Sequence, residues 1–330
     1  MCLLNRLFCF AVLFSLLGWV FPEPALALDP RIELTQYIHK SWRLDQGLPQ
    51  ISVNAIAQTP ENYIWVGTDD GLARFDGMHF TIYNRLNVPE LGSNSFQALL
   101  TSRDGSLWAA TSAGLVRYHK GVFRTYTLKD GLPHGYISSL ALDRNGALWL
   151  GTLGGGLVCF ARDRFTTYTA ADGLAHDEVW AVHASPDGSI WAGTRRGLSR
   201  YKSGIFTAYT KQTGLADNWV HALCSDGKGG LYVGTDRGLQ HLQGGTPAAV
   251  TTVPGLESVS VQSLAVDRNG MLWVGTCYIG VRRVHNGTVA DYTSAQGLSN
   301  DQAWSLMEDR EGNLWIGTRG GGLNCLRDPV

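Results

Sequence analysis

Seven near-copies of one short stretch run through the chain, and the clearest copy is Asp143-Arg144-Asn145-Gly146-Ala147-Leu148-Trp149-Leu150-Gly151-Thr152. The core of each copy is an aromatic residue followed, three positions later, by threonine. The aromatic residues of the seven cores are Trp65, Trp108, Trp149, Trp191, Tyr232, Trp273 and Trp315. The threonines lie 43, 41, 42, 41, 41 and 42 residues apart. This regular spacing predicts a tandem repeat of about 42 residues.

Each copy carries the signals of four short strands. A turn such as Asp143–Gly146 separates the first two strands, because Asp and Asn form local side-chain bonds and Gly accepts positive φ. Gly-Leu pairs precede the first and third strands, and aromatic residues such as Phe165 and Tyr168 mark the fourth. No useful length of sequence has a helical apolar period. We therefore predict an all-β fold, a single seven-bladed β-propeller with four antiparallel strands per blade.

The two ends of the chain predict how the ring closes. The seventh copy stops after its third strand, Gly322–Leu326, without an aromatic fourth strand. Trp42 precedes Gly47 by five residues, just as Tyr168 precedes Gly173. We therefore expect residues near 35–42 to supply the missing strand, so that the last blade is closed by the N-terminal strand. A closed ring avoids the unpaired strand edges of a linear array.

The recurring tryptophans are predicted to fill the space between neighbouring blades, where a buried aromatic side chain contributes roughly 1.5–3 kcal/mol. The rival interpretation is a platform on which sugars stack. That interpretation is disfavoured because a binding site needs a few aromatic rings facing one cavity, whereas these residues repeat around the whole ring.

The first residues have the pattern of a secretory signal. Arg6 supplies a positive charge, Leu7–Phe21 an apolar stretch, and Ala25-Leu26-Ala27 a cleavage site. The alternative is a membrane anchor, but the apolar stretch is shorter than the ~20 residues that a span needs. We expect a signal peptide over 1–27 and the propeller over 28–330. The mature protein is then periplasmic or secreted, with no membrane span after signal cleavage.

Charge and cysteine content narrow the range of partners. The formal net charge is −1, which argues against a nucleic acid partner because phosphates require a basic surface. Cys2 and Cys9 belong to the predicted signal. The other cysteines, which the repeat register places on four different blades, are Cys159, Cys224, Cys277 and Cys325. We expect buried free thiols there, in preference to disulfides or a zinc site.

The repeat pattern Asp-x-x-Gly-x-Leu-Trp-x-Gly-Thr-x-x-Gly-Leu, followed by Phe-x-x-Tyr, closely resembles the two-component regulator propeller repeat. The opening segment Trp42–Gln50 is also similar to the start of those sensor regions, and the resemblance covers residues 34–326. It implies a periplasmic ligand-sensing module of bacterial two-component signal transduction. Members of the family detect extracellular nutrients, often glycan fragments. We expect a module that lacks its own output domain and works with a partner, such as a membrane sensor kinase or a second propeller.

The predicted ligand site lies where loops that vary between blades meet. The loops that lead into the inner strands and those that follow the second strands are expected to open on one face, around the central channel. The candidate ligand-binding residues on these loops are His134, His176, Glu178, Arg195, Arg196, Trp219, Asp236, Arg237, Tyr278 and Arg319.

Blades four and five hold most of these candidates. Arginine forks and a tryptophan face favour a small molecule or glycan, with an acidic oligosaccharide as the leading candidate. The simpler interpretation at any one position is a solvated ion pair on the rim. Trp180 and Trp304 share one inner-strand position, where they either line the central channel or plug it.

Two other classes of function stay open. A propeller enzyme similar to streptogramin lyases would need a general base and a metal at the mouth, for which His176 and Glu178 are the best pair. A scaffold that binds another protein would use the same face. His134 and His176 alone are too few ligands for a metal site. The sequence therefore predicts no catalytic residue, no metal site and no cofactor.

Overall fold

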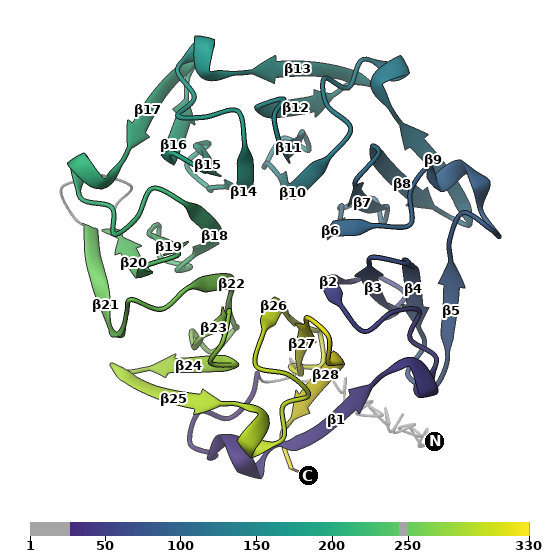
Figure 1. Cartoon of the computed structure of the whole chain (residues 1–330), viewed down its shortest axis with the longest axis vertical. Coiled ribbons are helices and arrows are strands. Elements are labelled where there is room, and N and C mark those ends of the chain that lie inside the picture. Colours follow the sequence, from purple (N-terminus) through teal and green to yellow (C-terminus); the bar gives the residue numbers. More distant parts are fainter. Residues whose placement is uncertain (1–26, 244–249, 330) are drawn as a thin grey trace, which may run out of the picture.

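The computed structural model describes residues 27–243 and 250–329, which form a ring of seven four-stranded antiparallel sheets (Figure 1). In six sheets the strands run outward in chain order, and in the seventh the outermost strand is β1. Seven inner strands therefore surround the centre of the ring. Blade 1 comprises β2 (Val53–Gln58), β3 (Ile64–Thr68), β4 (Gly71–Phe75) and β5 (Phe80–Tyr83). Blade 2 comprises β6 (Phe96–Thr101), β7 (Leu107–Thr111), β8 (Leu115–His119) and β9 (Val122–Tyr126). Blade 3 comprises β10 (Ile137–Leu142), β11 (Leu148–Thr152), β12 (Leu157–Ala161) and β13 (Arg164–Tyr168).

The remaining blades follow the same order. Blade 4 comprises β14 (Val179–Ala184), β15 (Ile190–Thr194), β16 (Gly197–Lys202) and β17 (Ile205–Tyr209). Blade 5 comprises β18 (Val220–Ser225), β19 (Leu231–Thr235), β20 (Gly238–Leu242) and β21 (Val250–Glu257). Blade 6 comprises β22 (Val261–Val266), β23 (Leu272–Thr276), β24 (Val281–His285) and β25 (Thr288–Tyr292). Blade 7 comprises β26 (Ala303–Glu308), β27 (Leu314–Thr318), β28 (Gly322–Arg327) and β1 (Ile38–Trp42). The predicted seven-bladed propeller is confirmed.

Short 3₁₀ turns connect most outer strands to the next blade. They are η2 (Leu44–Gln46), η3 (Pro89–Leu91), η4 (Leu128–Asp130), η5 (Ala170–Asp172), η6 (Lys211–Thr213) and η9 (Ser294–Gln296). A further such turn, η1 (Leu34–Gln36), precedes β1. In η5, for example, Asp172 accepts from the backbone N–H of Thr169, and Gly173 ends the turn at φ +103°. The buried Leu174 then anchors the chain below the next inner strand. The Gly-Leu pairs that precede the inner strands are therefore the ends of these turns.

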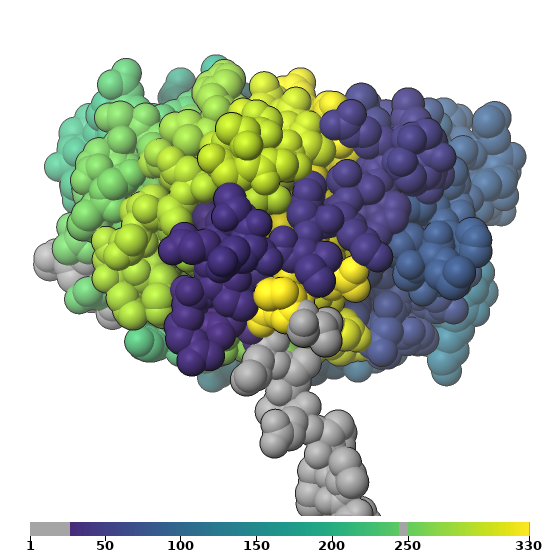
Figure 2. Space-filling view, turned by 90° about the horizontal axis from the view of Figure 1, so that it is seen from below, coloured from purple at the N-terminus to yellow at the C-terminus, as the bar shows by residue number. Residues whose placement is uncertain are grey.

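The N-terminal strand closes the ring as predicted. β1 pairs antiparallel with β28, with Trp42 opposite Leu323, and Figure 2 shows the N-terminal segment lying against the C-terminal blade. The Trp42 ring stacks on Trp315 at a centroid distance of 5.4 Å and meets Phe75 of blade 1 edge-on at 5.1 Å. The first and last parts of the chain thus share one hydrophobic core, and opening the ring would expose it.

Residues 27–37 form an N-terminal strap that the sequence did not predict. Leu28, Leu34 and Tyr37 join the core that contains Trp273, between blades 6 and 7. The buried Arg283 donates to the Ile32 carbonyl at 2.8 Å and to the Tyr37 hydroxyl at 3.0 Å. Burial raises the pKa of Tyr37 to about 12, so its neutral hydroxyl donates to the Asp29 carbonyl at 2.7 Å. The predicted signal peptide lies outside the described residues except for Ala27.

The repeated tryptophans fill six of the seven interfaces between blades, as predicted, and Tyr232 packs in the seventh. Trp191 of blade 4, for example, packs with Val220 and Leu231 of blade 5. In three blades the turn aspartate also accepts from the indole N–H six residues later. These bonds are Trp149 to Asp143 at 3.2 Å, Trp273 to Asp267 at 2.9 Å and Trp315 to Asp309 at 2.7 Å. The turn and the tryptophan of the repeat are therefore one unit, in which burial of the indole leaves its donor satisfied.

The Gly-Thr pair that ends the second strand controls how closely blades approach. A Cβ atom added to Gly193 would lie 2.6 Å from Cγ1 of Val220, the first residue of the next inner strand. The equivalent distance from Gly151 to Cγ1 of Val179 is 2.9 Å. The threonine hydroxyl donates to the carbonyl of the glycine that opens the third strand, at 2.7–2.9 Å in all seven blades. Glycine thus gives the room, and threonine holds the loop.

The four cysteines outside the predicted signal lie on four blades and are free thiols. Only Cys325 is fully buried, whereas Cys159, Cys224 and Cys277 are partly exposed, so the expectation that all four are buried is wrong for three of them. Burial raises the pKa of Cys159 and Cys224 to about 11 and that of Cys325 to about 12. These three groups are therefore neutral thiols at physiological pH.

Across residues 27–243 and 250–329, the structure has no helix with the length and apolar character needed to span a membrane.

The closing strand gives a first prediction. Trp42→Ala should destabilise the protein by about 2–4 kcal/mol, because it removes the ring that joins blades 7 and 1. Lys40→Ala, at an exposed residue of the same strand, should change the free energy of unfolding by less than about 0.5 kcal/mol. Urea unfolding followed by tryptophan fluorescence measures both. Equal stability of the two variants would contradict closure through β1.

The close approach of blades gives a second prediction. Gly193→Ala should destabilise by about 1–3 kcal/mol, because the methyl group meets Val220 of the next blade. Blade 2 has Ala110 at the equivalent position, fully buried, so the reverse change Ala110→Gly should cost at most about 1 kcal/mol of backbone entropy. Thermal unfolding compares the two variants, and an equal loss in both would argue against a steric limit at Gly193.

Candidate functional site at the mouth of the propeller

We call mouth face the end of the ring at which the inner strands begin. The loops that lead into the inner strands meet the loops between second and third strands there. In blade 4 the backbone N–H of Arg195 donates to the Glu178 carbonyl at 3.2 Å, and in blade 7 Arg319 donates to Gln302 at 2.9 Å. The two sets of loops therefore share one face, as the sequence predicted.

Every inner strand has a β-bulge at its second residue. In blade 4 the register with β15 shifts between Val179 and Ala181, which leaves Trp180 outside the ladder. A bulge re-aims one side chain without disturbing the strand around it. The seven bulge residues are Asn54, Gln97, Ser138, Trp180, His221, Gln262 and Trp304. These positions differ from blade to blade, whereas the third residue of each inner strand is always Ala or Ser, so the fold leaves the bulge positions free to vary.

Each bulge residue has a companion in its own blade, the residue directly after the threonine of the second strand. The seven mouth pairs are Asn54 and Asp69, Gln97 and Ser112, Ser138 and Leu153, Trp180 and Arg195, His221 and Asp236, Gln262 and Cys277, and Trp304 and Arg319. Three of them are in direct contact. Asn54 donates to Asp69 at 2.8 Å, His221 bonds to Asp236 at 2.9 Å, and the Arg319 guanidinium lies 4.3 Å above the Trp304 ring.

Blades 4 and 5 bring three aromatic side chains together, which we call the aromatic cluster (Trp180, Trp219 and His221). The rings of Trp180 and Trp219 meet edge-on at 5.7 Å, and those of Trp219 and His221 lie 4.8 Å apart. The Arg195 guanidinium lies 5.2 Å from the Trp219 ring. All three aromatic residues are partly exposed, so the cluster offers ring surface at the mouth.

The charged groups around the aromatic cluster are largely paired with one another. Arg195 forms an ion pair with Glu178 at 3.2 Å, and Arg237 lies 3.6 Å from the Asp217 carboxylate. Asp236 accepts from His221 and, at 3.0 Å, from the Ser260 hydroxyl. Because these pairs are exposed, each contributes little to stability. They do fix where carboxylate oxygens and guanidinium groups stand around the cluster.

His221 is held as a neutral imidazole. Burial lowers its pKa, and the nearby Asp236 carboxylate opposes that shift without reversing it. Because the carboxylate accepts, Nε2 carries the proton of the 2.9 Å bond and Nδ1 remains an acceptor. The mouth therefore presents a neutral ring beside carboxylate oxygens.

Three indole N–H groups at the mouth are buried donors without a hydrogen-bond partner in the described chain. They belong to Trp180, Trp219 and Trp304. Unpartnered buried donors are uncommon in proteins, and each one calls for an explanation such as water or a ligand. Their concentration at the mouth singles out this part of the described chain as the place where a polar ligand or ordered water would improve hydrogen bonding.

The predicted site residues lie in three different surroundings. Glu178, Arg195, Trp219 and Asp236 come together around the aromatic cluster. His134 and His176 instead accept from the backbone N–H of Tyr136 and Glu178, at 3.2 and 3.0 Å, and so shape the loops before the bulges. The side chains of the remaining candidates, Arg196, Arg237, Tyr278 and Arg319, are exposed at the mouth. Within the described ranges, no group of three or more potential ligands could hold a metal ion.

Sequence reasoning did not assign His221, Ser260 and Gln262 to the site. Gln262 donates to the Ser260 hydroxyl at 3.1 Å, and Ser260 in turn donates to Asp236, so a polar chain extends from blade 5 into blade 6. The aligned repeats do carry a signal for His221 and Gln262, because the bulge position differs from blade to blade.

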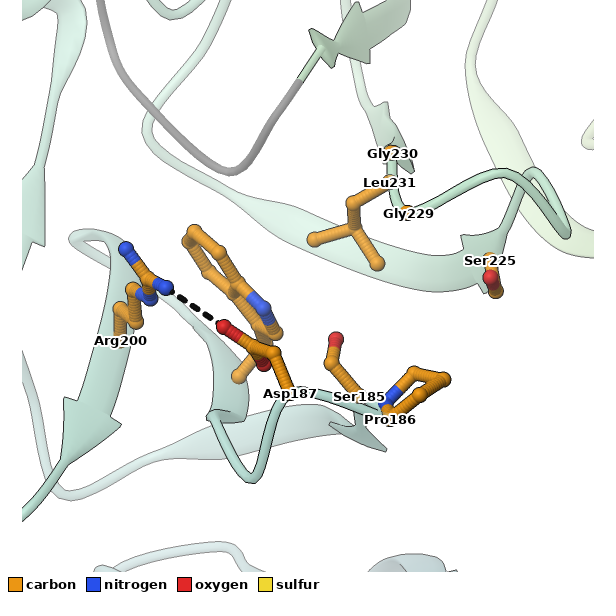
Figure 3. A pocket seen from close by; sticks show the side chains of 9 residues that line it. Ser185, Pro186, Asp187, Arg200, Ser225, Gly229, Gly230 and Leu231 are labelled. Atoms are coloured by element: carbon orange, nitrogen blue, oxygen red, sulfur yellow. Dashed lines mark hydrogen bonds and ion pairs between the residues drawn. The ribbon is translucent and has the colours of Figure 1, made fainter.

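Clefts on the face opposite the mouth are lined mainly by the repeat framework. A cleft of about 270 Å³ lies between the β14–β15 and β18–β19 turns, and Figure 3 shows Asp187 and Arg200 facing each other across part of it, 2.8 Å apart. Burial opposes ionisation of Asp187, but hydrogen bonds from Lys202, Ser189 and Arg200 hold its pKa well below the usual range. A larger cleft of about 900 Å³ lies between blades 5 and 6. No mouth pair lines either cleft.

Comparison with known proteins places this geometry in a family. The profile described as "Two component regulator propeller" matches residues 47–70, 131–154, 214–237, 255–278 and 297–320. A 65-residue segment is 42% identical to "Histidine kinase P4" from Formosa agariphila, covering 20% of this chain and 5% of that protein.

Solved structures share the fold at low sequence identity. The extracellular domain of BT3049 from B. thetaiotaomicron, assigned to hybrid two component systems, is 23% identical with a TM-score of 0.79, covering 89% of this chain and 42% of that one. A streptogramin B lyase is 14% identical with a TM-score of 0.71, covering 88% and 97%. This chain thus spans about two fifths of the BT3049 domain. Five segments of the chain therefore match the two component regulator propeller repeat, each in register with a blade.

Proposed function

We propose that this propeller is the ligand-recognition module of a bacterial two-component signalling system, and that its ligand binds at the mouth against the aromatic cluster. The observation that carries the proposal is the meeting of Trp180, Trp219 and His221 at positions that the repeat leaves free to vary. Elsewhere in the described chain the repeated tryptophans are committed to the packing between blades. The aromatic cluster lies outside that packing, and its partly exposed rings are available to a ligand.

The cluster suits a small glycan. Indole faces pack against the apolar C–H surface of a sugar ring, and the carboxylates of Glu178 and Asp236 stand beside them to accept from its hydroxyl groups. The neutral His221 offers a further acceptor at Nδ1. Family resemblance points to the same class, because related sensors detect glycan fragments. An acidic oligosaccharide keeps its place as the leading candidate within that class.

Signalling through this module requires a partner protein. The segment matched in a histidine kinase and the likeness to a domain assigned to hybrid two component systems both support a membrane sensor kinase as that partner. A second propeller is the other partner of this kind. The secretory pattern of residues 1–27 supports a location in the periplasm or outside the cell. The extracellular location of the BT3049 domain supports the same proposal.

A lyase is the second candidate function, because the described mouth holds a hydrogen-bonded imidazole and carboxylate, His221 and Asp236. Such a pair can abstract a proton from a bound substrate. The two functions differ in what happens to the ligand. A sensor releases it unchanged, whereas a lyase converts it.

The proposed site gives a third prediction. In a thermal unfolding screen against neutral and acidic oligosaccharides, a ligand at 100 times its dissociation constant should add about 2.7 kcal/mol of stability. Trp219→Ala should abolish that gain, whereas Trp219→Phe, which keeps an aromatic face, should retain part of it. Chromatography of the recovered ligand should show it unchanged. A shift that survives Trp219→Ala would rule out the aromatic cluster as the site, and a consumed ligand would establish the lyase.

A further inference from the structure

We propose that the mouth also binds an anionic group, a carboxylate or sulfate, on blade 7 through Arg319 stacked on Trp304. This inference rests on the proposed function, since it assigns one charged group of the ligand to a second position at the same mouth. It also places that group away from blades 4 and 5, where the sequence alone had placed most of the arginine candidates.

Blades 4 and 7 provide an internal comparison. They are the two blades whose mouth pair is a tryptophan and an arginine, Trp180 with Arg195 and Trp304 with Arg319. In both blades, the backbone N–H of the arginine donates to the backbone carbonyl of the residue just before the inner strand. That residue is Glu178 in blade 4 and Gln302 in blade 7. The two sites therefore share this backbone hydrogen bond. They differ in the carboxylate of Glu178 and in the ring below the guanidinium, which is Trp219 for Arg195 and Trp304 for Arg319.

The carboxylate decides whether the guanidinium is available. Glu178 forms an ion pair with Arg195 at 3.2 Å, so an incoming anion must displace an internal one. Gln302 is neutral, and no carboxylate of the described chain lies within ion-pair distance of Arg319. In the next blade, Asp69 accepts from Asn54 and Ser95 instead. Blade 7 is thus the same arrangement with its charge uncompensated.

Stacking prepares Arg319 to bind an anion. With the guanidinium 4.3 Å above the Trp304 ring, one face of the cation is covered and its N–H groups remain in the open plane. Those N–H groups form the fork that matches a carboxylate or sulfate in bidentate fashion. The stacked ring also limits the side-chain freedom that would otherwise be lost on binding.

The other mouth arginines lack one or both of these features. Arg237 lies 3.6 Å from the Asp217 carboxylate. Arg196 has no aromatic ring beneath its guanidinium in the described structure, and it is exposed. Arg319 alone among the mouth arginines in residues 27–243 and 250–329 combines a stacked ring with an unpaired charge.

The test adds to blade 7 the carboxylate that blade 4 has in Glu178. The full protein is titrated with sodium glucuronate, with sodium sulfate and with neutral glucose at constant ionic strength. Binding is followed by calorimetry and by the NMR signals of the arginine Nε–H groups. Gln302→Glu gives blade 7 the carboxylate of blade 4, and Arg319→Gln removes the cation. Gln212→Glu, an exposed position on η6, adds the same charge elsewhere as the matched control.

We expect glucuronate and sulfate to shift the Arg319 signal in the unmodified protein. Gln302→Glu and Arg319→Gln should each weaken anion binding about tenfold or more, as for loss of a charge-assisted pair. Gln212→Glu should stay within about twofold of the unmodified protein, since exposed charges are screened by salt. Glu178→Gln should make the Arg195 signal responsive to sulfate as well. Sulfate and glucuronate arms separate a free inorganic anion from a sugar acid.

Unchanged anion affinity in both Gln302→Glu and Arg319→Gln would overturn the inference. If the unmodified protein binds glucuronate and glucose alike while binding of oligosaccharide still depends on Trp219, the inference fails and the proposed function stands. If oligosaccharide binding is absent and anions still shift Arg319, the proposed function fails and blade 7 is an independent anion site. An Arg195 signal that ignores sulfate in Glu178→Gln would refute the role given to the carboxylate.

Discussion

The close contact between one blade and the next governs the rest of this structure. The residue before the last threonine of each second strand is small, glycine in six blades and Ala110 in one, and the first residue of the next inner strand packs against it. Val220 could not approach β15 if Gly193 carried a larger side chain. This limit keeps neighbouring blades in close contact around the ring. The repeated tryptophans pack in six of these interfaces. In three blades the turn aspartate accepts a hydrogen bond from the indole N–H.

Because the repeated residues take part in this packing, the recognition that we propose falls to positions outside it. The bulge at the second residue of each inner strand frees one side chain per blade, and the residue after the threonine stands next to it. Seven such pairs surround the mouth, and they differ in character from blade to blade. Blade 5 has an imidazole and a carboxylate, while blade 7 has a stacked indole and guanidinium. A rigid ring can therefore change specificity by changing one pair at a time.

The fold was predictable because its determinants repeat. Trp, Gly and Thr recur at fixed spacing, and the missing fourth strand of blade 7 pointed to residues 35–42, of which 38–42 form β1. The strap was not predictable, since Leu34 and Tyr37 occur once and carry no repeat signal. For the candidate site, the sequence predicted that two sets of loops share one face, which they do, and four of the predicted residues meet there, Glu178, Arg195, Trp219 and Asp236. It could not show which charges neutralise each other, because that depends on side-chain geometry between loops far apart in sequence.

The central claim is that ligands are recognised by the mouth pairs and not by the clefts between blades on the opposite face. A crystallographic screen in which crystals are soaked with a library of small sugars and organic acids tests it most directly. Our account predicts density for bound molecules concentrated beside Trp180, Trp219 and His221, and beside Arg319. Density concentrated in the opposite clefts, such as the one lined by Tyr232 and His285, with an unoccupied mouth would contradict it.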